Sequence, residues 1–436
     1  EYDKAKNEYA KALHILEKKN LNTGQQYGFI LGEIADVYRK TAAYNTAKGF
    51  YESSLNIIKS CCGDKHPEVA EVLNSMGILL KKQGKYAEAL PIYEESLDII
   101  KTIFGTNHYK YATGLNNIGD LHRKTGNFEQ AILFYTDAQK VFSVTLGEEH
   151  AEYAEVSNNI GLVYKKQGNY PLALQAYENA IRITFKQFGA AHVKVGIYLS
   201  NLADVFRKQG KYQKALQTYD QAFDIICRCL GIQDAEIADI RQSRALVYIE
   251  QDKFDTADAD LTSASNIIRR TFGEQHPKMG FCLHKRGMLE FAKGNISQAI
   301  EVLEKSLKIL KQTLDKYHPE VADVLITLGE VQSVKDSSAA LISFKTALEI
   351  IFFCFGKEHY KYKSISNSIH SLGGSIPQFK LPKVSKTSGK QDWRKALDSL
   401  IAQSSSKESI SNHGNTSKKG DSNTQAVLIA MSSGLI

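Results

Sequence analysis

A period of 42 residues runs through most of this chain and constrains its fold more than any other feature. The clearest example is NNIGLVYKKQGNYPLALQAYENAI, residues 158–181. One turn position returns at this spacing, and it is filled by Ala42, Gly84, Gly126, Gly168, Gly210, Asp252 and Gly294. A fixed period of this length is the signature of stacked supersecondary units, so we expect a repeat architecture.

Small and large apolar residues keep fixed distances from the turn position. Five residues after it stands an alanine, from Ala47 through Ala299, and four residues later a ring or large apolar side chain, as in Tyr177. Seven residues before it stands Ala or Gly, as in Gly161. The apolar spacing on each side of the turn is helical, which predicts two amphipathic helices per unit. Because a Gly inside a helix costs about 1 kcal/mol relative to Ala, its return indicates close helix packing.

The linkers between units repeat as well. Three of them carry His-Pro, at His66-Pro67, His276-Pro277 and His318-Pro319. The same His position is filled by His108, His150, His192 and His359. Pro at the first helical position is a helix start signal, so each linker is predicted to open a helix. Seven histidines that lie one repeat apart cannot converge on one active site, and we interpret them as capping or linker residues.

Small, aromatic and small residues on paired helices resemble the tetratricopeptide repeat, whose usual unit is about 34 residues. The 42-residue version, with Leu115-Asn116-Asn117, Gln83-Gly84-Lys85-Tyr86 and a GxxHP linker, resembles the arrays of kinesin light chains and nephrocystin-type proteins. The resemblance covers Glu1 to about Leu372. Kinesin light chains carry a heptad coiled coil before their repeats, whereas Glu1 opens in the middle of a unit.

We therefore expect an all-α, right-handed superhelical solenoid over residues 1–372. It comprises about eight helix pairs, opened by a lone second helix and closed by a helix near His359 to Leu372. Residues 373–436 are rich in Ser, Lys, Asn and Gly, and are expected to be a mostly disordered tail with a short amphipathic helix near 391–403.

Composition narrows the function classes. The chain has 436 residues, 43% hydrophobic and 24% charged, which is ordinary for a globular protein. Of the net charge of +7, the tail holds +5, from nine Lys or Arg against four Asp or Glu, so the repeats lack the basic face of a nucleic-acid binder. We expect no membrane segment, cofactor, metal site or catalytic residue, and six cysteines without repeat spacing fit reduced thiols in the cytoplasm.

The predicted concave face is lined by the first helix of each pair. Two residues before the turn position stand Lys82, Lys124, Lys166 and Lys208; nine before it stand Asn117, Asn159 and Asn201. Asn can bond to any peptide backbone, and the Lys row favours acidic residues. This Asn position is a ligand-contact position in tetratricopeptide proteins, which the resemblance carries over to these three residues, with Asn74, Asn116 and Asn158 beside them in the LNN signature.

Further features leave alternatives open. Ile78 and Leu162, six residues before the turn, are hypothesised to floor shallow side-chain pockets. The Asn residues could instead bond between repeats and hold the stack together, and the Lys row could be a solvated face. The joint loss of Asn and Lys after Lys208 favours ligand contact. The tail around Trp393, preceded by Asp392, could dock in the groove, because kinesin light chains bind Trp flanked by acidic residues.

The function expected from these features is that of a non-enzymatic scaffold or adaptor, similar to kinesin light chains. It would hold an extended acidic peptide segment of a protein partner in its concave groove. The alternative is a regulatory or sensing array of a larger protein whose enzymatic or nucleotide-hydrolysing domain lies outside these residues.

Overall fold

The computed structural model describes residues 2–314 and 316–379, together with Ser399, and these residues form 18 helices. Helix α1 (Tyr2–Lys18) stands alone, and eight helix pairs follow, which we number as units 1 to 8. The pairs are α2 (Gln25–Lys40) and α3 (Tyr44–Cys62); α4 (Pro67–Gln83) and α5 (Tyr86–Phe104); α6 (Tyr109–Lys124) and α7 (Phe128–Thr145); α8 (Ala151–Lys166) and α9 (Tyr170–Phe188); α10 (Val193–Lys208) and α11 (Tyr212–Leu230); α12 (Ala235–Ile249) and α13 (Phe254–Phe272); α14 (Pro277–Ala292) and α15 (Ile296–Thr313); α16 (Pro319–Gln332) and α17 (Ser337–Phe355). Helix α18 (Tyr360–Ser371) closes the array, so the predicted order is confirmed.

The turn position ends the first helix, helix A, of units 1 to 7 in the predicted way. Gly84, Gly168 and Gly210 have φ of 80°, 75° and 72°. This left-handed conformation is favourable for Gly because it has no Cβ. Ala42 and Asp252 adopt it too, with φ of 60° and 58°, so the turn geometry is common to units with and without Gly.

The linker histidines open the next helix A. In each of the seven, Nδ1 accepts a hydrogen bond from the backbone N–H two residues later, as His276 does from Lys278 at 3.2 Å. In unit 6 the carboxylate of Asp234 makes the same bond at 2.9 Å. This satisfies an N–H that has no partner inside the helix, so the predicted capping role is confirmed.

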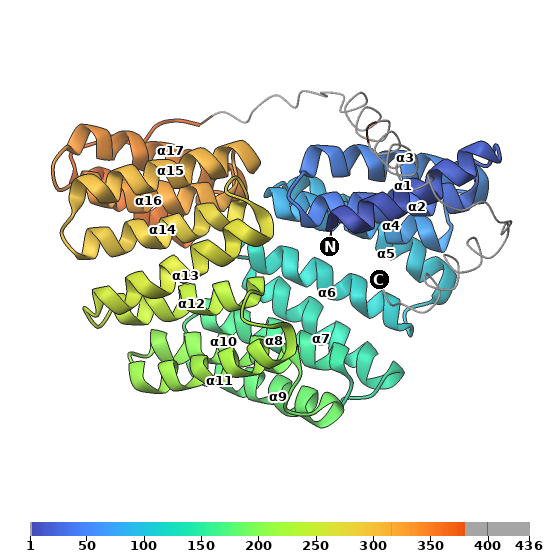
Figure 1. Cartoon of the computed structure of the whole chain (residues 1–436), viewed down its shortest axis with the longest axis horizontal. Helices are drawn as coiled ribbons and strands as arrows, with labels where there is room; N and C mark the ends of the chain where they lie inside the picture. Colours follow the sequence, from blue (N-terminus) through green and yellow to red (C-terminus); the bar gives the residue numbers. More distant parts are fainter. Residues whose placement is uncertain (1, 315, 380–398, 400–436) are drawn as a thin grey trace, which may run out of the picture.

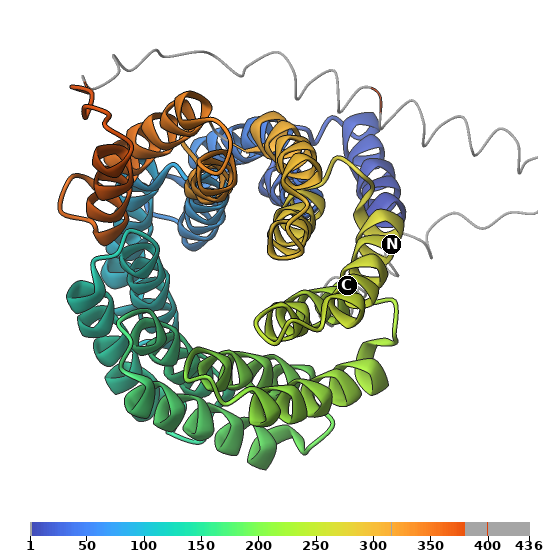
Figure 2. The same cartoon turned by 90° about the vertical axis from the view of Figure 1, so that its left-hand side faces the viewer.

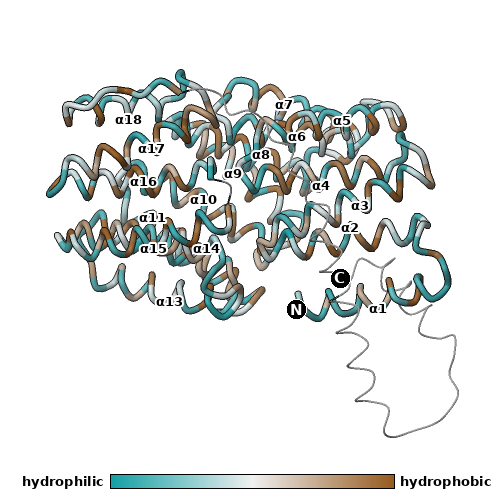
Figure 3. Tube along the Cα trace, turned by 90° about the horizontal axis from the view of Figure 1, so that it is seen from above, coloured by the Kyte–Doolittle hydropathy of each residue, from teal (hydrophilic) through white to brown (hydrophobic). Residues whose placement is uncertain are grey.

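The second helix, helix B, packs its ring against the small residue of helix A. Tyr51, Tyr93, Tyr135, Tyr177 and Tyr219 are all almost fully buried. Figure 3 shows hydrophilic and hydrophobic stretches interleaved along the helices, as expected when each buries one face. The core is therefore a continuous strip between the A and B layers.

The stack curves into a superhelix with the A helices inside (Figure 2). Successive A helices touch one another at every junction from α2–α4 to α14–α16. Figure 1 shows the three groups of helices that this curvature produces, with α14–α17 brought back towards α1–α5. The structure is an all-α repeat superhelix.

One superhelical turn brings unit 8 back onto unit 2, and we call this contact the seam. A methyl group added to Gly84 would lie 2.8 Å from Cδ2 of His318, and one added to Gly126 would lie 2.7 Å from Cδ2 of His359. Between them the rings of Tyr86 and Phe355 stack with centroids 6.1 Å apart. The seam thus joins the turns of units 2 and 3 to the linkers before α16 and α18.

Among the described helices, α17 alone is long and apolar enough to cross a membrane by length and composition. This apolar run is longer than we expected from the sequence. In the structure α17 is helix B of unit 8, and Phe344, Leu348 and Ile351 are buried in the core between α16 and α18. This packing accounts for part of its apolar composition.

The packed part of the chain continues past α18. Phe379 stacks on Phe352 of α17 with centroids 5.3 Å apart, and Ile376 packs on the same apolar cluster. The helix predicted near 391–403, including Trp393, lies outside the described residues except for Ser399.

Candidate protein-binding surface

The predicted Lys row lies on the inner A helices. Lys82, Lys124, Lys166 and Lys208 come from α4, α6, α8 and α10, and all four are exposed. Among the described residues, none of the four forms an ion pair with a carboxylate. The structure therefore places one unpaired ammonium group per unit on the inner surface.

The surroundings of three of these lysines, Lys82, Lys124 and Lys166, disfavour their charge. Neighbouring protein displaces water from Lys82 and lowers its pKa, and Arg39, Lys81 and Lys278 add to the effect. The pKa of Lys124 and of Lys166 is lowered for the same first reason, displaced water. An ammonium group that is partly shielded from water and has no carboxylate partner gains more from an anionic ligand than a freely solvated one does.

The cations one position earlier behave differently. Lys81 pairs with Asp120 of the next unit at 2.7 Å, and Lys165 pairs with Asp204 at 2.8 Å. Lys81 and Arg123 hold the pKa of Asp120 far below its ordinary range despite its burial. These pairs join successive A helices, so only the row two before the turn remains available.

The predicted Asn residues bond to one another between units. Asn117 donates to Asn74 at 2.7 Å. Asn159 donates to Asn116 at 3.0 Å, and Asn201 donates to Asn158 at 2.9 Å. This ladder joins three junctions of the inner layer, as in the interpretation where these residues hold the stack together.

The ladder continues beyond the Asn residues. Lys285 donates to Gln242 at 3.2 Å, and Nε2 of His284 bonds to Oγ1 of Thr327 at 2.8 Å. The joint loss of Asn and Lys after Lys208 therefore does not mark the end of the bonds between units, because other residue types make the equivalent bond. Sequence reasoning missed His284 and Lys285, although pairs of polar residues 43 positions apart would have identified them.

The amides retain hydrogen-bonding capacity beyond the ladder. Each Asn has two N–H donors and a carbonyl acceptor, and one ladder bond leaves part of this set unused. Asn117, Asn159 and Asn201 are half-buried on the inner side, whereas Asn158 is 7% exposed and also approaches Asn159 at 3.5 Å. Stack formation and ligand contact are compatible at the three half-buried positions.

Ile78 and Leu162 are half-buried and take part in the core. Ile78 packs against the cluster of Tyr86, Tyr93 and Ile118, and Leu162 packs against the cluster around Tyr177. In the next unit along the chain, the same position is filled by Asp120 and Asp204, respectively. These aspartates pair with Lys81 and Lys165, which lie on the same helices as Ile78 and Leu162. The hypothesis that they floor side-chain pockets stays a prediction.

This architecture defines a class: a superhelix of helix pairs whose inner layer presents a repeated polar surface. The sequence profile of the tetratricopeptide repeat family matches residues 26–101, 68–143, 152–228, 236–312 and 283–351. A second profile of the same repeat matches residues 116–187. The chain belongs to the tetratricopeptide repeat family, whose arrays typically mediate protein–protein interactions.

Several solved structures are similar at low identity. BtubC (BKLC) from P. vanneervenii is 22% identical over 53% of this chain and 91% of its own, with a TM-score of 0.43. The nearly identical TPR-like repeats of a Podosopora anserina protein of the kinesin light chain type are 19% identical over 47% and 97%, with a TM-score of 0.39. The apo form of RapI is 12% identical over 64% and 97%, with a TM-score of 0.48. No curated protein matches the sequence.

Proposed function

We propose that this array is a cytoplasmic, non-enzymatic adaptor that binds an extended acidic segment of a partner protein along its inner surface. The observation that carries the proposal is the row of Lys82, Lys124, Lys166 and Lys208, exposed and unpaired at one position of four successive units. A ligand with carboxylates along an extended chain matches a row of single cations better than a compact anion does.

The energetic argument rests on the contrast between the two rows of cations. Lys81 and Lys165 already have carboxylate partners, so a ligand gains nothing from them. Lys82, Lys124 and Lys166 are partly desolvated without a carboxylate to compensate, and each ligand carboxylate that arrives supplies the missing partner. The half-buried Asn117, Asn159 and Asn201 lie on the same helices and can bond the ligand backbone regardless of its side chains.

The test is fluorescence anisotropy with labelled acidic peptides and with neutral peptides of the same length. The variant replaces Lys82, Lys124, Lys166 and Lys208 with Gln, which keeps length and removes charge. The control replaces four exposed lysines of the outer helices, Lys101, Lys140, Lys186 and Lys305, in the same way. We expect the inner variant to lose at least about tenfold in affinity, and the control to bind like the parent.

Salt provides a second readout, because screening weakens interactions between exposed charges. Binding by the parent should fall with added salt, and residual binding by the inner variant should depend on salt much less. Equal affinity of the inner variant and the parent would remove the Lys row from the binding site. Equal affinity for acidic and neutral peptides would reject the acidic ligand.

A further inference from the structure

The superhelix has two edges, which differ chemically and meet at the seam. The turn edge consists of the turns between helix A and helix B; the linker edge consists of the linkers between units. At the seam, the turn edge of units 2 and 3 receives the linker edge before α16 and α18. Outside the seam, a methyl group added at Gly168, Gly210 or Gly294 on the turn edge would meet nothing within 4 Å.

Both sides of the seam are duplicated in the sequence at places that it does not cover. The turn QGKY occurs at 83–86, in the seam, and again at 209–212. The linker HPEVA occurs at 318–322, in the seam, and again at 66–70. The next linker, FGKEHYKY at 355–362, returns as FGTNHYKY at 104–111, with six of eight residues identical.

The duplicates share local geometry with their seam counterparts. Phe355 stacks on His359 with centroids 4.5 Å apart, and Phe104 stacks on His108 at the same 4.5 Å. Both His66 and His318 cap their helices through Nδ1, at 3.3 Å and 3.1 Å. The free surfaces are therefore built in the conformation that the seam uses.

Burial separates the covered surfaces from the free ones. His318 is 7% exposed and Tyr86 is 8% exposed, whereas His66 and Tyr212 are only half-buried. Phe104 is 37% exposed although its neighbours match those of Phe355. The difference in exposure between these matching segments shows the surface that the seam removes from water.

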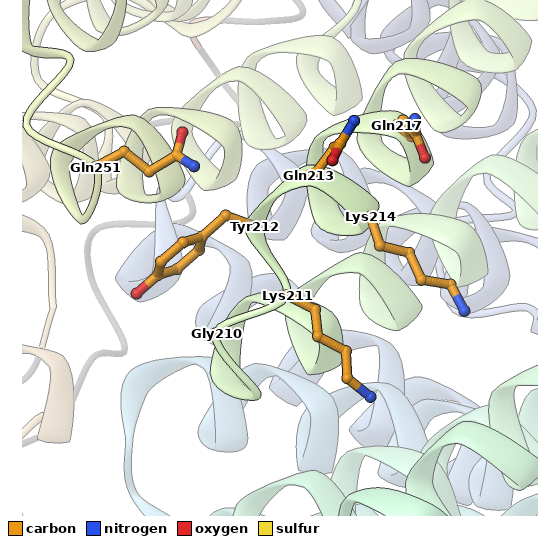
Figure 4. Close-up of a pocket in the computed structure, with 7 residues that line it drawn as sticks. All are labelled: Gly210, Lys211, Tyr212, Gln213, Lys214, Gln217 and Gln251. Atoms are coloured by element: carbon orange, nitrogen blue, oxygen red, sulfur yellow. The ribbon is translucent and has the colours of Figure 1, made fainter.

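The free turn at Gly210 borders a shallow, open depression. Residues Gly210, Lys211, Tyr212, Gln213, Lys214, Gln217 and Gln251 line a pocket of about 600 Å³. Figure 4 shows Tyr212 at the start of α11 and Gln251 from the turn after α12 on one side of it, with Lys211 and Lys214 on the other. It lies where the equivalent turn at Gly84 receives His318.

We propose that a second copy of this chain docks its linker edge, around His66 and Phe104, onto this open turn edge. The two free surfaces cannot meet within one chain, because the seam joins a turn and a linker that are six units apart, whereas the linker before unit 2 and the turn of unit 5 are only three units apart. In the intermolecular seam, His66 of the second copy approaches Gly210 as His318 approaches Gly84, and Phe104 stacks on Tyr212 as Phe355 stacks on Tyr86. The contact repeats an interface that the fold already forms.

One position differs between the two seams. Asp252 stands where the covered turn edge has Gly126, so His108 of the second copy cannot approach as closely as His359 does. Nδ1 of His108 is occupied by the helix cap, which leaves Nε2–H free to donate to the Asp252 carboxylate. A hydrogen bond replaces the close ring contact at this end of the interface.

The proposed interface is heterologous, since one copy contributes its turn edge and the other its linker edge. Such contacts continue from copy to copy unless the geometry closes into a ring. Association should therefore produce a series of masses that grows with concentration. This property does not depend on the inner Lys row, so the peptide experiment and this one can fail independently.

The test is sedimentation velocity of the full chain over a dilution series, with Tyr212→Glu and Phe104→Glu each blocking one edge. We expect the parent to associate with rising concentration, and each variant alone to remain a single chain. A mixture of the two variants still has one intact edge of each kind, so it should form a complex of two chains and no larger species.

Leu133→Glu is the control, because Leu133 is an apolar residue of α7 that is 53% exposed and belongs to neither proposed surface. It should associate like the parent. Circular dichroism checks that the variants are folded. A parent that stays monomeric at all concentrations, variants that associate undiminished, or a mixture without two-chain complexes would overturn the proposal.

Discussion

At the scale of single residues, the position seven before the turn shows how one atom sets the packing of a unit. A Cβ on Gly77, Gly119 or Gly161 would lie 2.6–2.8 Å from ring carbons of the tyrosine of helix B. Units 1 and 5 carry Ala there, and their tyrosines, Tyr51 and Tyr219, donate to Asp36 and Asp204. The sequence period predicted close packing but not this difference in ring position.

Gly161→Ala should lower the free energy of unfolding, because its methyl group would lie 2.7 Å from Cε1 of Tyr177. Overpacking costs about 1–3 kcal/mol, while the better helix propensity of Ala returns about 1 kcal/mol. Urea denaturation followed by circular dichroism measures the net change. Ala203→Gly is the reverse change at the same position of unit 5, where no clash is relieved. A Gly161→Ala protein more stable than the parent would contradict this expectation.

At the scale of helices, each linker combines a cap and a ring stack in one side chain. His276 accepts the N–H of Lys278 and lies flat against Phe272, with centroids 4.4 Å apart. The acceptor role requires neutral imidazole with its proton on Nε2. The repeated linker thus requires uncharged histidine at the start of seven helices.

Acid should weaken the array through these helix starts. Burial, with Lys278 and Lys82 nearby, lowers the pKa of His276 to about 4, and burial with Lys361 nearby lowers that of His359 to about 4. The unfolded chain binds these protons near pH 6.5, so the free energy of unfolding should fall as the pH drops from about 6.5 towards 4. Thermal unfolding between pH 7 and pH 5, before most carboxylates titrate, measures this loss.

The double variant His276→Asn and His359→Asn separates the cap from the charge. Asn caps helices without titrating, and Asp234 shows that a short side chain fits this position. We expect the double variant to have a flatter stability profile over the same pH range. A slope equal to that of the parent would mean that other groups cause the acid loss.

At the scale of the whole molecule, the seam joins the start of the superhelix to its end, so that the units form a continuous wall. Small rotations from one unit to the next accumulate until unit 8 reaches unit 2. The contact combines the Tyr86–Phe355 stack with two histidines seated against glycines. Local packing between neighbouring units therefore determines a contact between distant ones.

Phe355→Ala should open this wall without unfolding the units, because it removes the ring that covers Tyr86 while the helix pairs keep their own cores. Small-angle X-ray scattering should show a larger radius of gyration. Phe188→Ala is the matched control, since Phe188 stacks on His192 in the same way, at 4.4 Å, but lies outside the seam. Equal radii for the two variants would show that the Phe355 stack does not hold the seam.

The sequence was sufficient for the parts of this molecule that repeat. Helix pairs, turn glycines and histidine linkers follow from contacts within one unit or between neighbours, and all are confirmed. The Asn residues were predicted as an inner row, but their mutual bonds depend on the offset of one helix against the next. The seam depends on the summed rotation of six units, which no local pattern states.

The seam also has a kinetic consequence for any ligand that binds inside. A flexible segment with a free end can thread along the superhelix axis at a rate that rises with its concentration. A segment in the middle of a folded partner cannot thread, and must wait until Phe355 separates from Tyr86. As the concentration of such a partner rises, its observed association rate should level off at the rate at which Phe355 separates from Tyr86. Release requires the same separation, so the residence time of the partner depends on a contact that it never touches.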